Sequence, residues 1–571
     1  MSRITRRPTR VIVEERLVGE GVHPVLARLF AARGIDKRVD IDSGLESLLP
    51  PDGLLGIDRA AILLADAIET GKRLLIVADY DCDGATACAV GLRALKSMGA
   101  TVDYLVPDRF KFGYGLTPEI VALAATRNPD MIITVDNGIA SIEGVAAANA
   151  LNIAVVVTDH HLPGLALPEA AAIVNPNQPG CTFASKAIAG VGVMFYVMLA
   201  LRAELRRRGK FAEGNEPALA DLLDLVALGT VADVVKLDRN NRILVSQGLK
   251  RMRAGRLKVG MKALFAVSGR LFDRAGTFDL GFAVAPRLNA AGRLEDMSLG
   301  IECLATDDEA KALNIARRLD ELNRERRTIE SGMKEQADAI IDGIDVGERF
   351  SLSLYDPAWH QGVVGIVAGR LKDRHHRPVF AFAPSDGGQI RGSGRSIQGL
   401  HLRDALDLVD KRAPGMLLRF GGHAAAAGVT LLESDFTRFQ ELLEDVVRGL
   451  IAPSDLLRVI ETDGALESSY LSLSVAKLLE AQIWGQGFPQ PVFSGEFAVR
   501  NQRVVGEKHL RLKLDAGGRT IEAMRFNAAE SLPAAVNAAY RISVNEYNGL
   551  QSLQLIIEDW EPARSAGKTK P

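Results

Sequence analysis

Acidic side chains follow directly after short apolar runs at three points in the first half of the chain. The three segments and the runs before them are Asp79-Tyr80-Asp81-Cys82-Asp83 after residues 74–78, Asp136-Asn137-Gly138 after residues 131–135, and Asp159-His160-His161 after residues 154–158. A fourth acid, Asp233, follows the apolar run 223–231. Carboxylates gathered in one place repel each other unless cations lie between them. Together with imidazole, they suit Mn²⁺ or Mg²⁺. The residues therefore predict a site for two hard divalent metal ions.

The apolar runs before the first three acidic segments must position these side chains. They are short, rich in Val and Ile, and separated by helix-like segments, which is typical of buried parallel strands. In open parallel sheets, ligands bind beyond the carboxyl ends of the strands. We therefore expect the three segments to meet at one edge of a sheet. For Asp79, Asp81 and Asp83 we expect an extended chain, because alternate residues then project on the same side.

A calcium-binding EF-hand loop is the alternative explanation of Asp79-x-Asp81-x-Asp83-Gly84. That loop needs a glutamate at its twelfth position, which here is Val90. The motif also follows an expected strand rather than a helix. The EF-hand is therefore excluded.

Three glycine- or arginine-rich segments further along the chain have the composition of anion sites. They are residues 287–293 (RLNAAGR), 392–396 (GSGRS) and 419–428 (RFGGHAAAAG). Glycines let backbone amides approach an anion, and arginine and serine side chains add donors suited to phosphate. The alternative for the last two segments, a pair of tight turns, stays open at this point.

The composition is that of an ordinary globular protein with ample core. The chain has 571 residues, 47% hydrophobic, 25% charged and 5% aromatic, with a net charge of −2. This charge gives no global attraction to nucleic acid or to an anionic membrane. The four cysteines show neither paired zinc spacing nor a disulfide framework, which fits a reduced cytoplasm. We expect no signal peptide and no membrane span.

The pattern along the chain predicts an α/β multidomain protein. A doubly wound parallel-sheet domain is followed by a helical connector with a long charged helix at about 307–341, a second α/β region and a β-rich region that suits an oligonucleotide-binding (OB) barrel. The expected limits are 1–45 for a helical lead-in, 46–245 for the parallel-sheet domain, 246–345 for the connector, 346–455 for the second α/β domain, 456–562 for the barrel and 563–571 for a disordered tail.

The strand-end acids, the Asp159-His160-His161 triplet and the Gly421-Gly422-His423 segment together resemble the DHH phosphoesterase superfamily with its associated C-terminal domain. The fuller pattern, which includes residues 231–233, 287–293, 484–489 and 545–549, is similar to the bacterial single-strand-specific exonucleases of that superfamily. The resemblance covers nearly the whole chain. One departure is Trp484-Gly485-Gln486-Gly487-Phe488, where relatives usually have Phe-Gly-x-Gly-Asn.

The resemblance implies roles for individual residues. Two Mn²⁺ or Mg²⁺ ions would be held by Asp81, Asp83, Asp136, His160 and Asp233, with Asp136 bridging them. Asp79, a further candidate at the metals, and Asp159 would orient these ligands, and His161 would lie near the scissile phosphate. The implied catalytic set is Asp81, Asp83, Asp136, His160, His161 and Asp233. The implied substrate-binding set is Arg287, Asn289, Arg293, Ser393, Arg395, Ser396, Gly421, Gly422 and His423.

The implied function is a metal-dependent single-stranded-DNA exonuclease that acts from the 5′ end, releases mononucleotides and serves DNA repair and recombination. The expected partners are single-stranded DNA, a single-strand-binding protein and a helicase, and the expected state is a cytoplasmic monomer. Two alternatives stay open. One is a phosphodiesterase of the same superfamily that cleaves oligoribonucleotides or cyclic dinucleotides, and the other is a non-catalytic DNA-binding relative. The additional domains favour a polymer as the substrate.

Overall fold

The computed structural model of the chain describes residues 3–108, 112, 114–212, 214–342 and 345–563. These residues form two compact units. The N-terminal unit comprises residues 8–323 and 477–491, and the C-terminal unit comprises residues 1–7, 324–476 and 492–571. The expected tail falls almost entirely on residues 564–571, which lie outside the described part. Within the described part, no helix is both long and apolar enough to cross a membrane.

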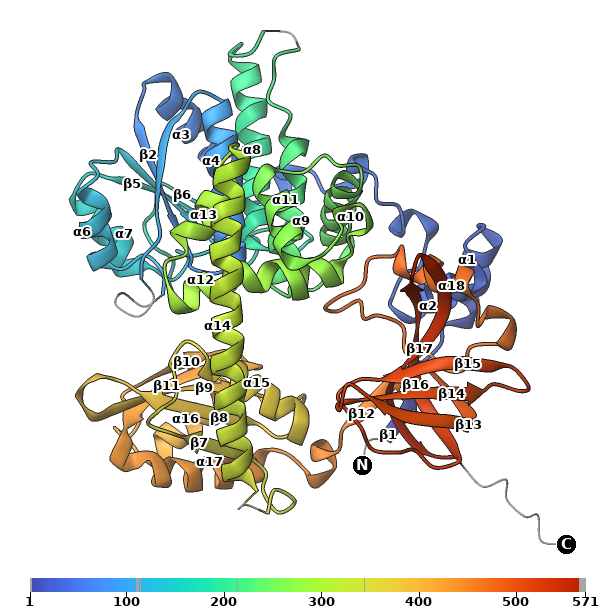
Figure 1. Cartoon of the computed structure of the whole chain (residues 1–571). Coiled ribbons are helices and arrows are strands. Elements are labelled where there is room, and N and C mark those ends of the chain that lie inside the picture. Colours follow the sequence, from blue (N-terminus) through green and yellow to red (C-terminus); the bar gives the residue numbers. More distant parts are fainter. Residues whose placement is uncertain (1–2, 109–111, 113, 213, 343–344, 564–571) are drawn as a thin grey trace, which may run out of the picture. The chain divides into compact units, whose positions relative to one another are not determined.

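A five-stranded parallel sheet forms the centre of the N-terminal unit (Figure 1). Its strands are β2 (Arg73–Ala78), β3 (Thr101–Leu105), β4 (Met131–Val135), β5 (Ala154–Thr158) and β6 (Ala172–Val174), in the order β3-β2-β4-β5-β6. All neighbouring pairs are parallel. Strand β4 is buried at every position, and β2 is buried after its first residue, because helices cover both faces. The expected parallel sheet is thus confirmed.

Helices cover both faces of this sheet. On one face, α6 (Pro118–Ala125) and α7 (Ile142–Ala150) pack on a core that includes Leu75, Val77, Ile132 and Val155. The other face carries α3 (Ile57–Glu69), α4 (Cys82–Ser97) and α8 (Gly190–Arg207), and α9 (Leu223–Ala232) packs on α4 and α8. The strand order reverses between β2 and β4, so the topological switch point lies at the carboxyl ends of these two strands.

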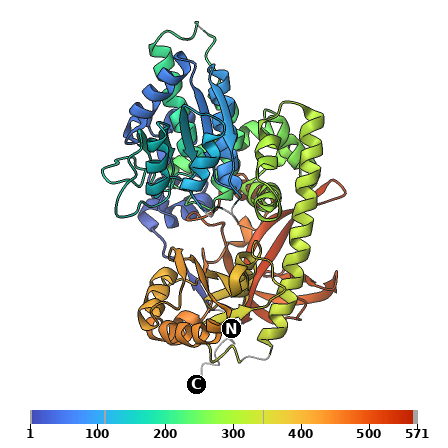
Figure 2. The ribbon, with the colours of Figure 1, turned by 90° about the vertical axis from the view of Figure 1, so that its left-hand side faces the viewer.

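The rest of the N-terminal unit is helical. Its helices are α1 (Val11–Gly19), α2 (Pro24–Ala32), α10 (Arg239–Arg253), α11 (Val259–Ser268), the π-helix η6 (Asp279–Val284), α12 (Ala285–Leu294) and α13 (Ser298–Ala305). The long helix expected at about 307–341 is α14 (Glu309–Ile341), a single helix of 33 residues that connects the two units along the chain (Figure 2).

Two segments depart from the expected organisation. Residues 3–6 do not belong to a helical lead-in but form strand β1 (Arg3–Arg6), which pairs in parallel with β12 (Val459–Thr462). Residues 477–491, expected in the barrel domain, belong to the N-terminal unit. There Trp484 and Phe488 are buried and stack on each other, and both rings lie 6.0 Å from the ring of Phe30 in α2. Aromatic packing thus fixes this segment to the lead-in helices.

The C-terminal unit contains a second α/β sheet and a barrel. The sheet has the order β10-β11-β9-β8-β7. Its strands are β7 (Leu352–Tyr355), β8 (Val379–Pro384), β9 (Gln389–Arg395), β10 (Arg419–Gly422) and β11 (Ala426–Leu432), and its helices are α15 (Val364–His375), α16 (Leu402–Arg412) and α17 (Phe436–Leu450). Only β7 and β8 pair in parallel; the other pairs are antiparallel.

The C-terminal strands close into the expected barrel, in the order β13-β14-β15-β17-β16. They are β13 (Phe493–Val505), β14 (His509–Asp515), β15 (Thr520–Arg525), β16 (Ala535–Tyr547) and β17 (Leu550–Pro562), preceded by helix α18 (Leu473–Glu480). Alternate residues of β14 are buried, as in a strand with one face in a barrel interior.

Candidate metal centre

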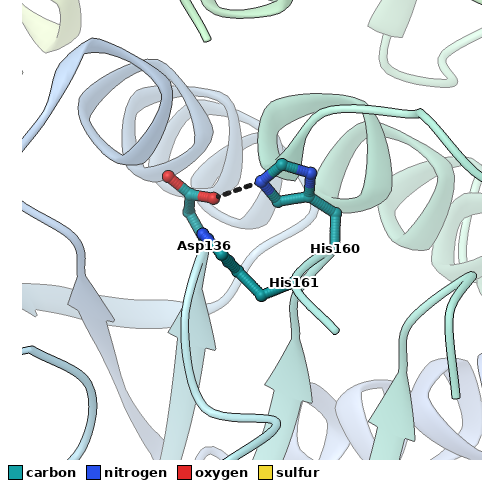
Figure 3. Close-up of side chains that lie close together, drawn as sticks. All are labelled: Asp136, His160 and His161. Atoms are coloured by element: carbon teal, nitrogen blue, oxygen red, sulfur yellow. Dashed lines mark ion pairs between the residues drawn. The ribbon is translucent and has the colours of Figure 1, made fainter. Parts of the chain in front are cut away.

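Four acidic segments meet at the carboxyl ends of β2, β4 and β5, at the topological switch point of the parallel sheet. Asp79 follows β2, Asp136 follows β4, and His160 and His161 follow β5 by two and three residues (Figure 3). Asp233 reaches the same place from the C-terminal end of α9, since its carboxylate lies 3.4 Å from His160 Nε2. The expected meeting of the acids at one edge of the sheet is therefore confirmed.

The chain after β2 turns into a helix instead of staying extended. Asp81 is the N-cap of α4, where its Oδ1 accepts a hydrogen bond from Gly84 N, and Asp83 lies in the first helical turn. The expectation of an extended Asp79–Asp83 segment was therefore wrong. The helix forms here because an aspartate satisfies free amides at a helix start. Gly84 allows the turn, since a β-carbon there would lie 2.5 Å from Asp79 O.

Asp83 is fully buried, and backbone amides fix both of its carboxylate oxygens. Gly190 N donates to Oδ2 at 2.7 Å and Val191 N donates to Oδ1 at 3.0 Å. Both amides belong to the first turn of α8, where the helix dipole also favours a negative charge. Even so, burial and the neighbouring Asp81 raise the pKa of Asp83 to about 7.

Asp136 adopts a left-handed backbone conformation, with φ of +63°. Such a conformation is uncommon outside glycine and costs free energy, so the surrounding structure must hold it. The Asn137 side chain does so by donating to the carbonyls of Val77 and Val135, which ties the ends of β2 and β4 together. Gly190 leaves room for the carboxylate, because a β-carbon there would lie 2.6 Å from Asp136 Oδ1.

The imidazole of His160 faces Asp136. Burial, followed by the neighbouring His161, lowers the pKa of His160 to about 4, so the ring is neutral. A hydrogen bond to the backbone of Ile188 partly opposes this lowering, and Nε2 lies 3.1 Å from Asp136 Oδ1, the contact marked by the dashed line in Figure 3. Both of these buried atoms lack a hydrogen-bond partner among the described residues. A proton or a metal ion between the two atoms would satisfy both.

The carboxylates show the same need for positive charge. Burial, and then repulsion from Asp83 and Asp81, raises the pKa of Asp136 and of Asp233 well above the usual value. Three groups of side chains could each hold a metal ion, since within each group one ligand atom per residue lies within 4.8 Å of the others. The groups are Asp136–His160–His161, Asp83–His160–Asp233 and Asp79–Asp81–Asp136. Carboxylate oxygens and a neutral imidazole therefore fit divalent cations here.

Asp159 orients the histidines instead of facing the acid cluster. Its Oδ1 accepts from the amides of His160 and His161 and lies 2.8 Å from His161 Nδ1, while its Oδ2 accepts from Ile139 N. Burial alone would raise the pKa of Asp159, but these bonds outweigh it and lower the pKa. As a carboxylate Asp159 can only accept, so His161 Nδ1 carries a proton. Burial alone would lower the pKa of His161, but the contact with Asp159 outweighs it and raises the pKa.

Tyr114 belongs to the site although sequence reasoning did not select it. Its hydroxyl lies 3.0 Å from His161 Nδ1 and donates to the carbonyl of Asp136 at 3.1 Å, and its ring packs edge-on against His161 and Tyr80. Tyr114 lies in the connection between β3 and α6, where no periodic pattern or motif marks it. Only the fold brings it to the histidines.

Of the predicted substrate-binding residues, Asn289 contacts the acid-bearing loop. Its Oδ1 accepts from Cys82 N at 2.8 Å, between Asp81 and Asp83. Arg287 is 7% exposed and pairs with Asp320 at 2.8 Å, so its guanidinium already has an anionic partner within the protein. Arg293 is half-buried in the last turn of α12. Phosphate binding by these three residues stays a prediction.

The glycines of the 392–396 segment serve packing. They lie within β9, paired with β8 on one side and β11 on the other. A β-carbon on Gly392 would lie 2.4 Å from the Phe382 ring, and one on Gly394 would lie 2.5 Å from the Phe380 ring. These two glycines therefore lie neither in a tight turn nor at a backbone amide that is open to an anion.

The polar members of the same segments have partners within the C-terminal unit. Arg395 donates to Ser393 Oγ and to the Gly394 carbonyl, and burial lowers the pKa of Arg395. Ser396 donates to the Leu400 carbonyl. Gly421, Gly422 and His423 end β10 and begin its hairpin to β11, with φ of +140° at Gly422 and an exposed His423, so here the turn is confirmed. Their substrate binding stays a prediction.

Comparisons with known proteins agree with this architecture. Residues 73–230 match the DHH family N-terminal domain, residues 348–449 match the DHHA1 domain, and residues 462–559 match the RecJ OB domain. The chain is 49% identical to the single-stranded-DNA-specific exonuclease RecJ of Dickeya dadantii, over 98% of this chain and 99% of that protein. It is 48% identical to RecJ of Escherichia coli, over 94% and 96% of the two chains.

A solved structure supports the same assignment. The crystal structure of RecJ from Thermus thermophilus in complex with Mn²⁺ matches with a TM-score of 0.83 at 30% sequence identity, covering 99% of this chain and 80% of that chain. The domain content, the identity over nearly the whole length and the shared fold all indicate the same family. The chain belongs to the RecJ family of single-stranded-DNA-specific exonucleases.

Proposed function

We propose that the acid cluster at the β2–β4 switch point is the catalytic centre of this single-stranded-DNA exonuclease and that it holds two divalent metal ions, Mn²⁺ or Mg²⁺. The proposed ligands are Asp81, Asp83, Asp136, His160 and Asp233, with Asp79 beside them. Asp136 is the proposed bridge, because it belongs to two of the three groups whose atoms converge.

One observation carries this proposal. Asp136 Oδ1 and His160 Nε2 are buried 3.1 Å apart, and neither has a hydrogen-bond partner in the described part of the chain. The desolvation of two such acceptors is costly unless a cation binds them. The RecJ structures of Thermus thermophilus in complex with Mn²⁺ and with Mg²⁺ support the same choice of ions.

The protein side of the reaction follows from how the site is held. When bound, two divalent ions would supply a nucleophile by lowering the pKa of water and would stabilise negative charge on the phosphodiester. The protein fixes the proposed ligands in advance: the backbone of Ile188 bonds to His160, and the amides of Gly190 and Val191 fix Asp83. Asp159 holds the proton of His161 on Nδ1, so His161 Nε2 is the atom that we propose to face the scissile phosphate.

Further properties belong to the same proposal. We expect hydrolysis from the 5′ end with release of 5′-mononucleotides. Substrate phosphates would bind to Arg287, Asn289, Arg293, Ser393, Arg395, Ser396, Gly421, Gly422 and His423. The closed barrel would grip single strands, as OB folds do. A role in repair and recombination, a monomeric state, a cytoplasmic location and contacts with a single-strand-binding protein and a helicase complete the proposal.

Digestion of end-labelled DNA tests the proposal. Single-stranded and blunt duplex oligonucleotides, labelled at either the 5′ or the 3′ end, are incubated with Mn²⁺, Mg²⁺ or a chelator. We expect hydrolysis of the single strand alone, early release of the 5′ label as a mononucleotide, and no hydrolysis with the chelator. Early release of the 3′ label would contradict the polarity, and hydrolysis in the chelator would contradict the metal centre.

A further inference from the structure

Two phenylalanines lie exposed and stacked on each other in the N-terminal unit. Phe278 is 57% exposed and Phe282 is 68% exposed, and their rings stack with centroids 4.9 Å apart at an interplanar angle of 28°. Leu271, seven residues before Phe278, is 63% exposed. The catalytic centre does not use these side chains. A contiguous pair of exposed aromatic rings costs solubility and marks an interaction site more often than a scattered apolar residue does.

The backbone that carries this pair is unusual. Phe278 is the N-cap of the six-residue π-helix η6, Phe282 lies within it, and the helix continues directly into α12. Turns of π-helix are rare in proteins, and those that do occur often lie at functional sites. On the opposite side, Leu280, Ala283 and Val284 are buried, so the helix presents the two rings on its exposed side from a firmly packed support.

The same helix connects the pair to the catalytic centre. A β-carbon on Gly281 would lie 3.3 Å from Val231, two residues before Asp233. Further along, Asn289 binds Cys82 N, and Gly292 allows the helix to approach Tyr80 O. Residues 282 and 278 precede Asn289 by seven and eleven positions, which is about 10 to 16 Å along a helix. Stacked nucleotides rise about 3.4 Å each, so this separation is about three to five nucleotides.

The charge next to the rings is positive. Residues 250–282 contain eight lysines and arginines against two acids, Asp273 and Asp279, and Asp279 lies 3.6 Å from Arg270 Nε. Arg256, Lys262, Arg270 and Arg274 in this stretch are exposed, and the Arg270 guanidinium lies 5.9 Å from the centroid of the Phe278 ring. Stacked aromatic rings beside a basic surface are the combination that binds single-stranded nucleic acid without sequence preference. An acidic protein segment would bind the basic side chains but would not need stacked rings. An apolar segment would cover the rings but would not need the basic side chains.

We infer that Phe278 and Phe282 form a stacking platform for bases of the single-stranded substrate a few nucleotides from the scissile bond, with Arg270 beside it. The inference rests on the proposed catalytic centre, since it places the platform relative to the acid cluster. Stacking is independent of sequence, because every base has a π-face. The platform would therefore hold the strand in position without favouring any base.

Substitutions that separate ring stacking from apolar contact test this inference. The double variant Phe278→Leu/Phe282→Leu keeps the apolar surface but removes the rings, and Phe278→Tyr/Phe282→Tyr keeps the rings. Stacking contributes about 1–3 kcal/mol per base, so we expect the leucine variant to raise KM for a single strand about 10- to 100-fold, by the tenfold change in affinity for each 1.4 kcal/mol. We expect kcat to change less than about threefold, and the tyrosine variant to keep the parental KM.

The control is Leu151→Ala, which removes an equally exposed apolar side chain after α7, and we expect it to keep the parental KM. A substrate series sharpens the test: single abasic residues are placed at successive positions from the 5′ end. We expect one or two positions to raise the parental KM and to have no further effect in the leucine variant. An equal KM for the leucine variant and the parent, or the same positional loss in both, would overturn the inference.

A failure of the platform inference can be distinguished from a failure of the proposed catalytic centre. If that centre were wrong, Asp136→Ala would retain activity, whatever the platform variants do. If only the platform were wrong, Asp136→Ala would lose hydrolysis while the leucine variant and the abasic series behaved as the parent does. If the leucine variant kept the parental KM but lost binding to another protein, the two rings would form a protein-docking surface and not a nucleic-acid platform.

Discussion

Motifs of similar composition have different roles in the two α/β sheets of this chain. In the parallel sheet, the motif residues follow the carboxyl ends of β2, β4 and β5, where the amides of Asp79, Asp136 and Asp159 still bond to the neighbouring strand but the side chains are free to gather. In the mixed sheet, Gly392 and Gly394 lie inside β9 with partners on both sides. Position relative to the end of a strand, more than residue type, decides whether a motif serves chemistry or packing.

Glycine shows the difference most clearly. Gly190 leaves space for the carboxylate of Asp136, whereas Gly394 leaves space for the ring of Phe380. The same added methyl group would displace the Asp136 carboxylate beyond the end of β4 in one unit and a core side chain of the mixed sheet in the other. Activity and stability should therefore respond separately to substitutions in the two sheets.

The largest expected effect comes from the acid after β4. We expect Asp136→Ala to lower the rate of single-strand hydrolysis at least about a thousandfold, because electrostatic stabilisation at such centres is of that order. The matched control is Asp130→Ala, at the opposite end of the same strand, where the side chain accepts from Arg73 N. Rates under saturating Mn²⁺ check this, and a similar loss for both variants would mean that position at the strand end does not matter.

The next effect concerns the glycine beside that acid. We expect Gly190→Ala to lower kcat about a hundredfold, because the new β-carbon would push Asp136 by an ångström or so from its place, and misplacement on that scale costs about this much. Stability should change less than kcat does, since alanine favours the first turn of α8 although its methyl group overlaps Asp136. A variant with parental kcat would show that Asp136 tolerates displacement.

In the mixed sheet we expect a glycine substitution to lower stability rather than kcat. Gly394→Ala would force a methyl group against Phe380 and Leu402 and should lower the free energy of unfolding by about 1–3 kcal/mol, as overpacking does. Gly428→Ala on the paired strand is the control, because its β-carbon would meet only Gly392 O, at 3.9 Å. Denaturant unfolding followed by circular dichroism measures both, and equal stabilities would contradict the packing role of Gly394.

The smallest effect distinguishes two roles for Asn289. If it positions the acid-bearing loop through Cys82 N, Asn289→Ala should raise the Mn²⁺ concentration for half-maximal activity about tenfold, as loss of a group that orients metal ligands does. KM for DNA at saturating Mn²⁺ should stay close to the parental value. A raised KM with an unchanged Mn²⁺ requirement would support the substrate-binding role that the sequence predicted.

The sequence predicted the parallel sheet and the meeting of its acids because buried strands and acidic strand ends are local patterns. The predictions were wrong where packing between residues far apart in the sequence determines the local structure. The helix that begins at Cys82 replaced the expected extended segment, since Asp81 caps it. Residues 477–491 join the N-terminal unit because Trp484 and Phe488 stack near Phe30. Tyr114 reaches His161 from a connection with no pattern of its own.

Divalent cations at the strand ends would satisfy the buried atoms Asp136 Oδ1 and His160 Nε2. The direct measurement is the number of Mn²⁺ ions bound per chain, by calorimetric titration of metal-free protein, for the parent and for Asp136→Ala. We expect two ions in the parent, and at most one, bound more weakly, in the variant, because Asp136 joins two of the converging groups. Two ions bound to the variant with parental affinity would contradict the assignment of Asp136 and the account of the centre built on it.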